Sequence, residues 1–177
     1  MYEGVLVRFR ELRDADLKLA QKFINDPEVS RNLSPRTPFL ATLKDEKAFL
    51  DGISFMKDTY NFAIEAKDSN KYIGGCGINE IDWKNSVATV GIMIGDKDYW
   101  SKGYGTDAMK LLVKFIFEQM NVNKIKLNVY SFNERARKCY LRTGFTQEGI
   151  LREELFRDGK YHDIILMGIL KSEYFGI

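Results

Sequence analysis

The chain has 177 residues, a formal net charge of +2, a hydrophobic share of 45% and a charged share of 29%. This length and composition predict one globular domain covering residues 1–177. Lys and Arg are interspersed with Asp and Glu, so no nucleic-acid partner is expected. No apolar run approaches the roughly 18 residues of a membrane span, and the N-terminal segment lacks the pattern of a signal peptide, so we expect a cytoplasmic protein with no membrane partner.

The first third of the chain predicts a strand and two helices. Residues 5–12 alternate apolar and polar side chains, which predicts the strand. Asp14 is a candidate N-cap for a helix that Pro27 ends, and a second helix is expected around Lys44–Tyr60. Between the two helices, Ser30–Phe39 contains two prolines and no periodicity, which predicts a loop.

Three strand-like runs follow, at residues 61–68, 72–82 and 87–96, joined by short polar turns. The third run is apolar on both faces near its end, which is typical of a strand in the centre of a sheet. This part of the chain therefore predicts an antiparallel meander.

The second half predicts a helix at 107–120, a strand at 124–131, and a short helix that begins after Asn133 and ends at Gly144. Residues 145–170 predict two strands joined at Asp158-Gly159, a strong hairpin signal. The whole order indicates a mixed α/β layer with an antiparallel first half and a strand–helix–strand crossover in the second.

The stretch "YWSKGYGTDA" lies between the apolar third run and the helix at 107–120. Glycines at 103 and 105 leave the backbone N–H groups of a helix start open to an anion such as a phosphate. Lys102 adds a positive charge and Thr106 a hydroxyl. The spacing is not that of a Walker loop, and no acidic residue follows where a Rossmann dinucleotide site needs one. The alternative interpretation is a tight strand-to-helix turn without a ligand.

These motifs together resemble the GNAT superfamily of N-acetyltransferases, in the branch of ribosomal-protein N-terminal and spermidine acetyltransferases. "YWSKGYGTDAM" resembles the pyrophosphate loop of that branch, "NERARKCYLRTGF" its second cofactor motif, and "GILREELFRDGKYHDIILMGIL" its closing hairpin. "LVRFRELRDADL" is similar to its first strand and helix, so the resemblance covers nearly the whole chain. It implies a mixed, largely antiparallel twisted sheet with helices on both faces and a splayed central strand pair, with acetyl-CoA as co-substrate.

The resemblance also implies site residues. The loop backbone would bind the pyrophosphate of coenzyme A, the free edge of the central strand would pair with the pantetheine arm, and Tyr140 would be the general acid. The cofactor-binding residues implied are Ile92, Met93, Ile94, Trp100, Ser101, Lys102, Gly103, Tyr104, Gly105, Thr106 and Asn133. Two positions depart from the pattern. Trp100 stands where the superfamily signature has Arg or Gln, although this branch often has an aromatic residue there. Thr89 replaces a frequent glutamate, so the identity of the base is open.

The chemistry of acetyl transfer requires similar groups independently. Attack of an amine on a thioester needs a neutral amine, an oxyanion site and a proton for the leaving thiolate, which a phenol can supply. Tyr140 lies seven residues after Asn133, on the same helix face. The alternatives are a core tyrosine for Tyr140 and a plain helix cap for Asn133, and the cap is compatible with cofactor binding.

Three further residues carry weaker hypotheses. Cys139 has no base nearby and is interpreted as a small buried side chain, and His162 as a structural residue. Glu80 is a weak candidate for a base acting through water. With one histidine and no Cys/His cluster, no metal site is expected.

We therefore expect an enzyme that transfers the acetyl group of acetyl-CoA directly to a primary amine. Residues 14–60 carry eight acidic and seven basic side chains, without the carboxylate excess that a polyamine would favour. A protein or peptide N-terminus is thus the preferred acceptor, and a polyamine or another small-molecule amine is the alternative. A non-catalytic acyl-CoA-binding module is the alternative from another class, and a homodimer is left open.

Overall fold

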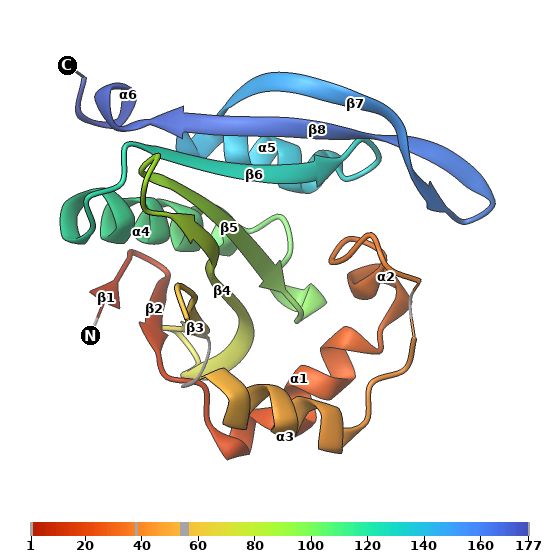
Figure 1. Ribbon diagram of the computed structural model, residues 1–177. Helices are drawn as coiled ribbons and strands as arrows, with labels where there is room; N and C mark the ends of the chain where they lie inside the picture. The colour runs from red at the N-terminus through yellow and green to blue at the C-terminus, as the bar shows by residue number, and fades with distance from the viewer. Residues whose placement is uncertain (1, 38, 54–56, 177) are drawn as a thin grey trace.

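The computed structural model describes residues 2–37, 39–53 and 57–176, which form a mixed α/β fold around an eight-stranded sheet (Figure 1). The strand order is β1-β2-β3-β4-β5-β6-β8-β7, and every neighbouring pair is antiparallel except β5–β6. The strands are β1 (Tyr2–Glu3), β2 (Val7–Arg10), β3 (Tyr60–Ala66), β4 (Lys71–Asp82), β5 (Val87–Ile94), β6 (Lys124–Tyr130), β7 (Thr146–Arg157) and β8 (Lys160–Leu170). The helices are α1 (Leu17–Ile24), α2 (Pro27–Ser30), α3 (Leu43–Gly52), α4 (Tyr104–Gln119), α5 (Glu134–Thr143) and α6 (Lys171–Phe175), with 3₁₀ turns η1 (Asp14–Asp16) and η3 (Lys97–Tyr99).

Helices cover both faces of the sheet, because successive strand residues point to opposite sides. On β3, Ile64 packs into the main core, which α4 covers with its apolar stripe. The neighbouring Ala63 faces the other way, into a smaller cluster with Ala20 and Phe23 of α1. The predicted fold class, a mixed and largely antiparallel sheet with helices on both faces, is confirmed. Across the described ranges, no helix combines the length and the apolar character needed to span a bilayer.

The second half of the chain follows the predicted elements closely. Asn133 caps α5, and Gly144 ends it with a left-handed φ of 104°. Asp158 and Gly159 connect β7 to β8 with φ values of 52° and 74°, the two positive dihedrals of a type I′ turn. Local signals determine these elements, so the sequence was sufficient to predict them.

The first half shows four corrections. Asp14 is not an N-cap: it begins η1, which is capped at Arg13, and the Asp16 carboxylate accepts the Arg13 N–H at 2.9 Å. Pro27 does not end a helix but starts α2, behind an Asp26 cap. The first strand is shorter than predicted, and its expected first residue, Val5, is 82% exposed.

The second predicted helix is also shorter. α3 ends at Gly52, and Tyr60 instead begins β3, after a turn in which Asp58 has a positive φ of 56°. Ser54–Met56, which the predicted helix included, lie outside the described residues. A left-handed residue is incompatible with a continuing helix, so the apolar spacing was a misleading signal there.

The central parallel pair separates part-way along its length. β5 pairs with β6 only through Val87, Ala88 and Thr89, whereas β6 pairs with β8 from Lys124 to Tyr130. Figure 1 shows β5 diverging from β6 beyond this point. The β6-facing edge of β5 therefore has no strand partner over its C-terminal half.

A buried ion network joins β2 to η1 and β3. The Arg10 guanidinium donates to both carboxylate oxygens of Asp16, at 2.7 and 2.8 Å, and its Nε donates to Glu65 at 2.6 Å. The three side chains are only 6–10% exposed. Burial by itself raises the pKa values of Asp16 and Glu65, but hydrogen bonds from Arg10, together with those from the Arg13 backbone to Asp16 and from Arg8 to Glu65, lower both pKa values. The network thus holds the first helical segment against the sheet.

We predict that Asp16→Asn lowers the free energy of unfolding at pH 7 by about 3 kcal/mol, because it leaves the buried Arg10 charge short of one carboxylate. A carboxylate with a depressed pKa stabilises the fold above its unfolded pKa and loses that contribution as pH falls. The variant should therefore show a flatter decline in stability below about pH 5 than the wild type. Urea unfolding at pH 7 and pH 4 measures both effects.

Glu11→Gln is the matched control, because Glu11 pairs with Arg13 at the surface with a side chain that is 66% exposed. The control is expected to keep the wild-type midpoint. An Asp16→Asn variant as stable as the control would contradict a stabilising role for the network.

Candidate active site

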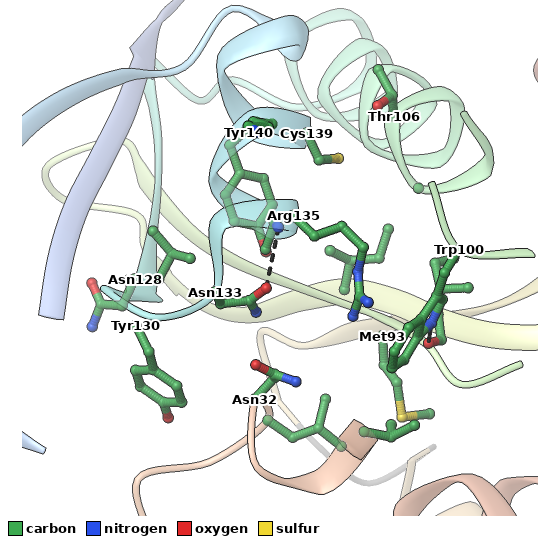
Figure 2. Close-up of a pocket in the computed structure, with 18 of the residues that line it drawn as sticks. Asn32, Met93, Trp100, Thr106, Asn128, Tyr130, Asn133, Arg135, Cys139 and Tyr140 are labelled. Carbon is green, nitrogen blue, oxygen red and sulfur yellow. Dashed lines mark hydrogen bonds between the residues drawn. The ribbon is translucent and has the colours of Figure 1, made fainter. Parts of the chain in front are cut away.

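A cleft of about 640 Å³ opens where β5 and β6 separate (Figure 2). Its walls come from the free edge of β5, the loop leading into α4, one face of α5, and α2 with the segment after it. The predicted site residues whose atoms line this cleft are Ile92, Met93, Ile94, Trp100, Ser101, Gly103, Gly105, Thr106, Asn133 and Tyr140. The fold thus brings together the two sequence motifs that lie about thirty residues apart.

The loop before α4 has the backbone that its glycines suggest. Gly103 is the N-cap of α4 with φ 94°, and Ser101 also has a positive φ, of 59°. A Cβ on Gly105 would meet Ile94 Cγ1 at 3.5 Å and Cys139 Sγ at 3.8 Å, which are ordinary contact distances. Gly103 is therefore required by conformation, whereas Gly105 keeps the space in front of the helix N-terminus open.

Contacts behind the loop hold it in place. The Tyr104 hydroxyl donates to Asp68 at 2.6 Å, and this hydrogen bond raises the pKa of Tyr104 to about 12. The Asp107 carboxylate accepts the backbone N–H groups of Val5, Leu6 and Val7 at 2.7–3.1 Å. The side chains of Tyr104 and Lys102 do not line the cleft, so their predicted part in cofactor binding rests on their backbone.

Tyr140 and Asn133 face the cleft from α5. Tyr140 is 7% exposed, and burial raises the pKa of its phenol. Within the described chain, its hydroxyl has no hydrogen-bond partner, unlike the locally bonded core tyrosine that was the alternative. The Asn133 Oδ1 accepts the Ala136 N–H at 3.2 Å, so the predicted cap is present, and the amide NH₂ remains available to a ligand.

Trp100 closes one end of the free strand edge. Its indole Nε1 donates to the carbonyl oxygen of Ile94 at 2.6 Å, which leaves the ring standing at the mouth of the cleft. The Arg135 guanidinium lies over this ring, 3.3 Å from the ring centroid (Figure 2). Sequence reasoning missed Arg135, although its position two residues after Asn133 places it in the first turn of α5.

A second missed residue, Arg157, holds the opposite wall. It is 5% exposed and donates to the backbone carbonyls of Arg31, Ser34 and Arg36 at 3.2, 2.6 and 3.2 Å. The predicted loop is therefore held at its start: α2 includes its first residue, Ser30, and Arg157 of the β7–β8 hairpin binds the backbone of residues 31–36. The sequence signal for Arg157 was its position just before the hairpin turn, but the carbonyls that it binds are more than 120 residues away in the chain.

The other candidates are settled by position. Cys139 was expected to be buried, and this expectation is wrong: the side chain is only partly buried and lines the cleft, where desolvation raises the pKa of its thiol. His162 bonds the carbonyl of Arg157 through Nε2 at 3.2 Å and packs edge-on against Phe132, as a structural residue would. Glu80 is exposed and does not line the cleft, whereas Thr89 does.

The charges that line the cleft all have one sign. The charged residues among its lining are Arg135, Lys138 and Arg142, all on α5, and no described Asp or Glu contributes to the wall. Over the described residues, no group of three or more His, Cys, Asp or Glu side chains is placed to hold a metal ion. The α5 end of the cleft therefore suits an anionic ligand, and the other end is lined by apolar and neutral polar groups.

Comparison with known proteins identifies the family. The pattern of the acetyltransferase (GNAT) domain matches residues 7–146, most of the chain. The chain belongs to the GNAT acetyltransferase family. This GNAT enzyme is accordingly an acetyl-CoA-dependent N-acetyltransferase.

Three similar proteins illustrate the range of the family around this GNAT enzyme. An uncharacterized N-acetyltransferase, p20, of Bacillus licheniformis is 32% identical over 176 residues, covering 98% of this chain and 97% of that protein. YdaF of Bacillus subtilis, a putative ribosomal N-acetyltransferase, is 31% identical over 103 residues, covering 58% of this chain and 56% of YdaF. The crystal structure of spermidine N-acetyltransferase from Vibrio cholerae in complex with CoA and spermine superposes with a TM-score of 0.86 at 25% identity, covering 96% of this chain and 98% of that one.

We predict that Gly105→Val raises the KM for acetyl-CoA at least about tenfold, or about 1.4 kcal/mol of binding, because its methyl groups would extend beyond the ordinary Cβ contacts into the cleft. Gly105→Ala is the matched control, since a Cβ alone fits at 3.5 Å from its nearest neighbour. Steady-state kinetics measures the effect, and circular dichroism verifies that both variants fold. An unchanged KM in folded Gly105→Val would rule out the loop as the cofactor site.

Proposed function

We propose that this enzyme acetylates the free α-amino group of a protein or peptide N-terminus, with Tyr140 as the general acid. The observation that carries the proposal is the Tyr140 side chain, which lines the cleft together with the open edge of β5 and whose hydroxyl has no partner among the described residues. Coenzyme A is bound by the backbone N–H groups of Ser101–Thr106, where the N-terminus of α4 attracts the pyrophosphate.

The free edge of β5 is suited to the thioester arm. The Gly95 N–H donates to the carbonyl oxygen of Ile73 in β4 at 2.8 Å. The Ile94 carbonyl instead points to the cleft and accepts a hydrogen bond from the Trp100 indole. Because successive strand residues turn their N–H and C=O groups to opposite edges, the Ile92 N–H also faces the cleft. This N–H is placed to pair with the pantetheine arm or to donate to the oxyanion that forms at the thioester carbonyl.

The reaction is a direct transfer. The neutral amine nitrogen attacks the thioester carbonyl carbon, a C–N bond forms, and the C–S bond breaks. Tyr140 donates its proton to the departing sulfur, the amine loses one proton to water, and the Tyr140 phenolate regains a proton from water to close the cycle. The raised pKa of Tyr140 keeps the phenol protonated at neutral pH, so the acid is ready before each turnover.

The cleft lining favours an α-amine over a polyamine. An α-amino group has a pKa near 7.7–8.0, so a useful fraction is neutral at pH 7 without help from a base. An aliphatic ammonium with a pKa near 10.4 would need a general base to become neutral, and no described carboxylate lines the cleft to act as that base. The acceptor end instead presents the apolar Leu33 and Pro35 and the amides of Asn32, Asn79 and Asn128, which suit a peptide backbone.

A polyamine is the second candidate, favoured by the comparisons with spermidine N-acetyltransferases. The Vibrio cholerae structure with a TM-score of 0.86 is a spermidine N-acetyltransferase bound to spermine. The putative ribosomal N-acetyltransferase YdaF supports the N-terminal candidate instead. The charge of the cleft is the feature of this chain that separates them.

We predict that Tyr140→Phe lowers kcat about 10²- to 10⁴-fold and leaves the KM for acetyl-CoA near the wild-type value, because the proton moves only on the way to products. The change should cost little stability, since the hydroxyl leaves no described partner unpaired. Steady-state kinetics and thermal unfolding measure the two effects.

Tyr72→Phe is the matched control. Tyr72 is 5% exposed, and burial likewise raises the pKa of its phenol, but it lies in the α1 cluster away from the cleft. The control should retain turnover. A Tyr140→Phe enzyme within a few-fold of wild-type kcat would refute the general-acid role.

The acceptor is tested by release of free thiol from acetyl-CoA with a panel of peptides, spermidine, amino sugars and aminoglycosides. Peptides with a free N-terminus should react fastest, and the same peptides with a blocked N-terminus are the control. With a peptide acceptor, kcat/KM should rise with pH through about 8 and show no decline from Tyr140 below pH 10. Faster reaction of spermidine would overturn the acceptor assignment, and no thiol release with any amine would favour a binding module.

A further inference from the structure

We infer that Arg135 of α5 is a clamp for the cofactor pyrophosphate, supplying a cation from across the cleft, because the loop cation Lys102 does not line the cleft. In the free enzyme its guanidinium is stacked on Trp100, and with donor bound it contacts the phosphate oxygens held by the loop. The inference rests on the proposed binding of pyrophosphate to Ser101–Thr106 and adds a residue to that site.

The geometry places Arg135 between the two cofactor motifs. Its side chain starts in the first turn of α5 and extends across the cleft until its guanidinium is 3.3 Å from the centroid of the Trp100 ring (Figure 2). Trp100 immediately precedes the loop and is fixed from behind by its hydrogen bond to Ile94. A guanidinium over this ring therefore lies beside the start of the loop that leads into α4, and it can still donate hydrogen bonds from its edge.

Arg135 has no counterion among the described residues. Within the described chain, no carboxylate forms a salt bridge with it, and partial desolvation lowers its pKa despite the distant charge of Glu28. Glu28 is itself paired with Lys97. A partly desolvated cation without a counterion is a favourable partner for a doubly charged diphosphate.

The sequence of the loop explains why a cation from elsewhere is needed. The position that Arg or Gln occupies in the superfamily signature is Trp100 here, which can bind no phosphate oxygen through charge. The side chain of Lys102 is exposed and does not line the cleft. Arg135 brings a guanidinium to the same entrance from a different helix, while Trp100 provides the surface that positions it.

The test compares acetyl-CoA with acetyl-pantetheine, a donor that has the same thioester arm and no phosphate. Arg135→Met should lower kcat/KM for acetyl-CoA by roughly 10- to 100-fold, the range expected when a hydrogen bond to a charged group is lost. With acetyl-pantetheine, kcat/KM should stay within a few-fold of the wild type. Arg135→Lys should recover part of the loss because it keeps the charge.

Arg137→Met is the matched control: Arg137 is on the same helix, lies outside the cleft lining, and is 3.7 Å from Glu134. It should leave both donors unaffected. An equal loss with both donors, or no loss with either, would overturn the clamp. If the wild type itself did not prefer acetyl-CoA to acetyl-pantetheine, the phosphate site in the loop would be disproved, and the clamp with it.

Discussion

β5 and β6 are held together by three residue pairs and then separate, and the rest of the site depends on this divergence. A fully paired β5 would have its N–H and C=O groups occupied by β6, and no strand edge would remain for a thioester arm. Because β6 is bound along its whole length to β8, the divergence falls on β5. The Trp100 indole caps the exposed edge at Ile94, and the loop and α5 close around the opening.

The cleft is divided into two chemically different ends by the elements that build it. All the charged residues in the described lining of the cleft are on α5, and all of them are cations. They lie at the same end of the cleft as the positive N-terminus of α4. α2 and the segment after it contribute apolar and neutral polar groups. The two ends are also fastened independently, by Asp107 and Tyr104 behind the loop and by Arg157 on the acceptor side. Sequence changes at the acceptor wall can therefore alter the amine recognised while leaving donor binding intact.

The sequence predicted what local signals determine. α5 has a cap at Asn133 and a stop at Gly144, and the last hairpin has Asp158-Gly159, so these elements lie where expected. The glycine loop likewise indicated a helix start, and α4 begins there at Tyr104, whereas its binding of an anion stays a prediction. The errors fell where tertiary contacts override local preference. The predicted cap at Asp14 is one case, because the Asp16 carboxylate accepts hydrogen bonds from both the Arg10 guanidinium and the Arg13 N–H.

Arg135 and Arg157 illustrate why part of the site was out of reach. Each acts on partners distant in the sequence, Trp100 in one case and the backbone of residues 31–36 in the other. Any residue type can provide a backbone carbonyl, so no sequence motif could predict the contact of Arg157 with residues 31–36. Thr89 left the identity of the general base open, and the proposed α-amine acceptor would need little help from a base to lose its proton.

The strand order β6-β8-β7 has a consequence for how this protein is made. β8 is inserted between two strands that precede it in the chain, so β6 keeps an open edge during synthesis until residues 160–170 leave the ribosome. The register joins Lys124 to Leu170, a contact that closes late and over a long loop. Ile164 of the same strand lines the cleft, so the catalytic wall is completed only in this last step. A nascent chain stalled before β8 would present an unpaired strand edge to its neighbours and no finished site, which ties protection from aggregation and the onset of activity to a single folding event.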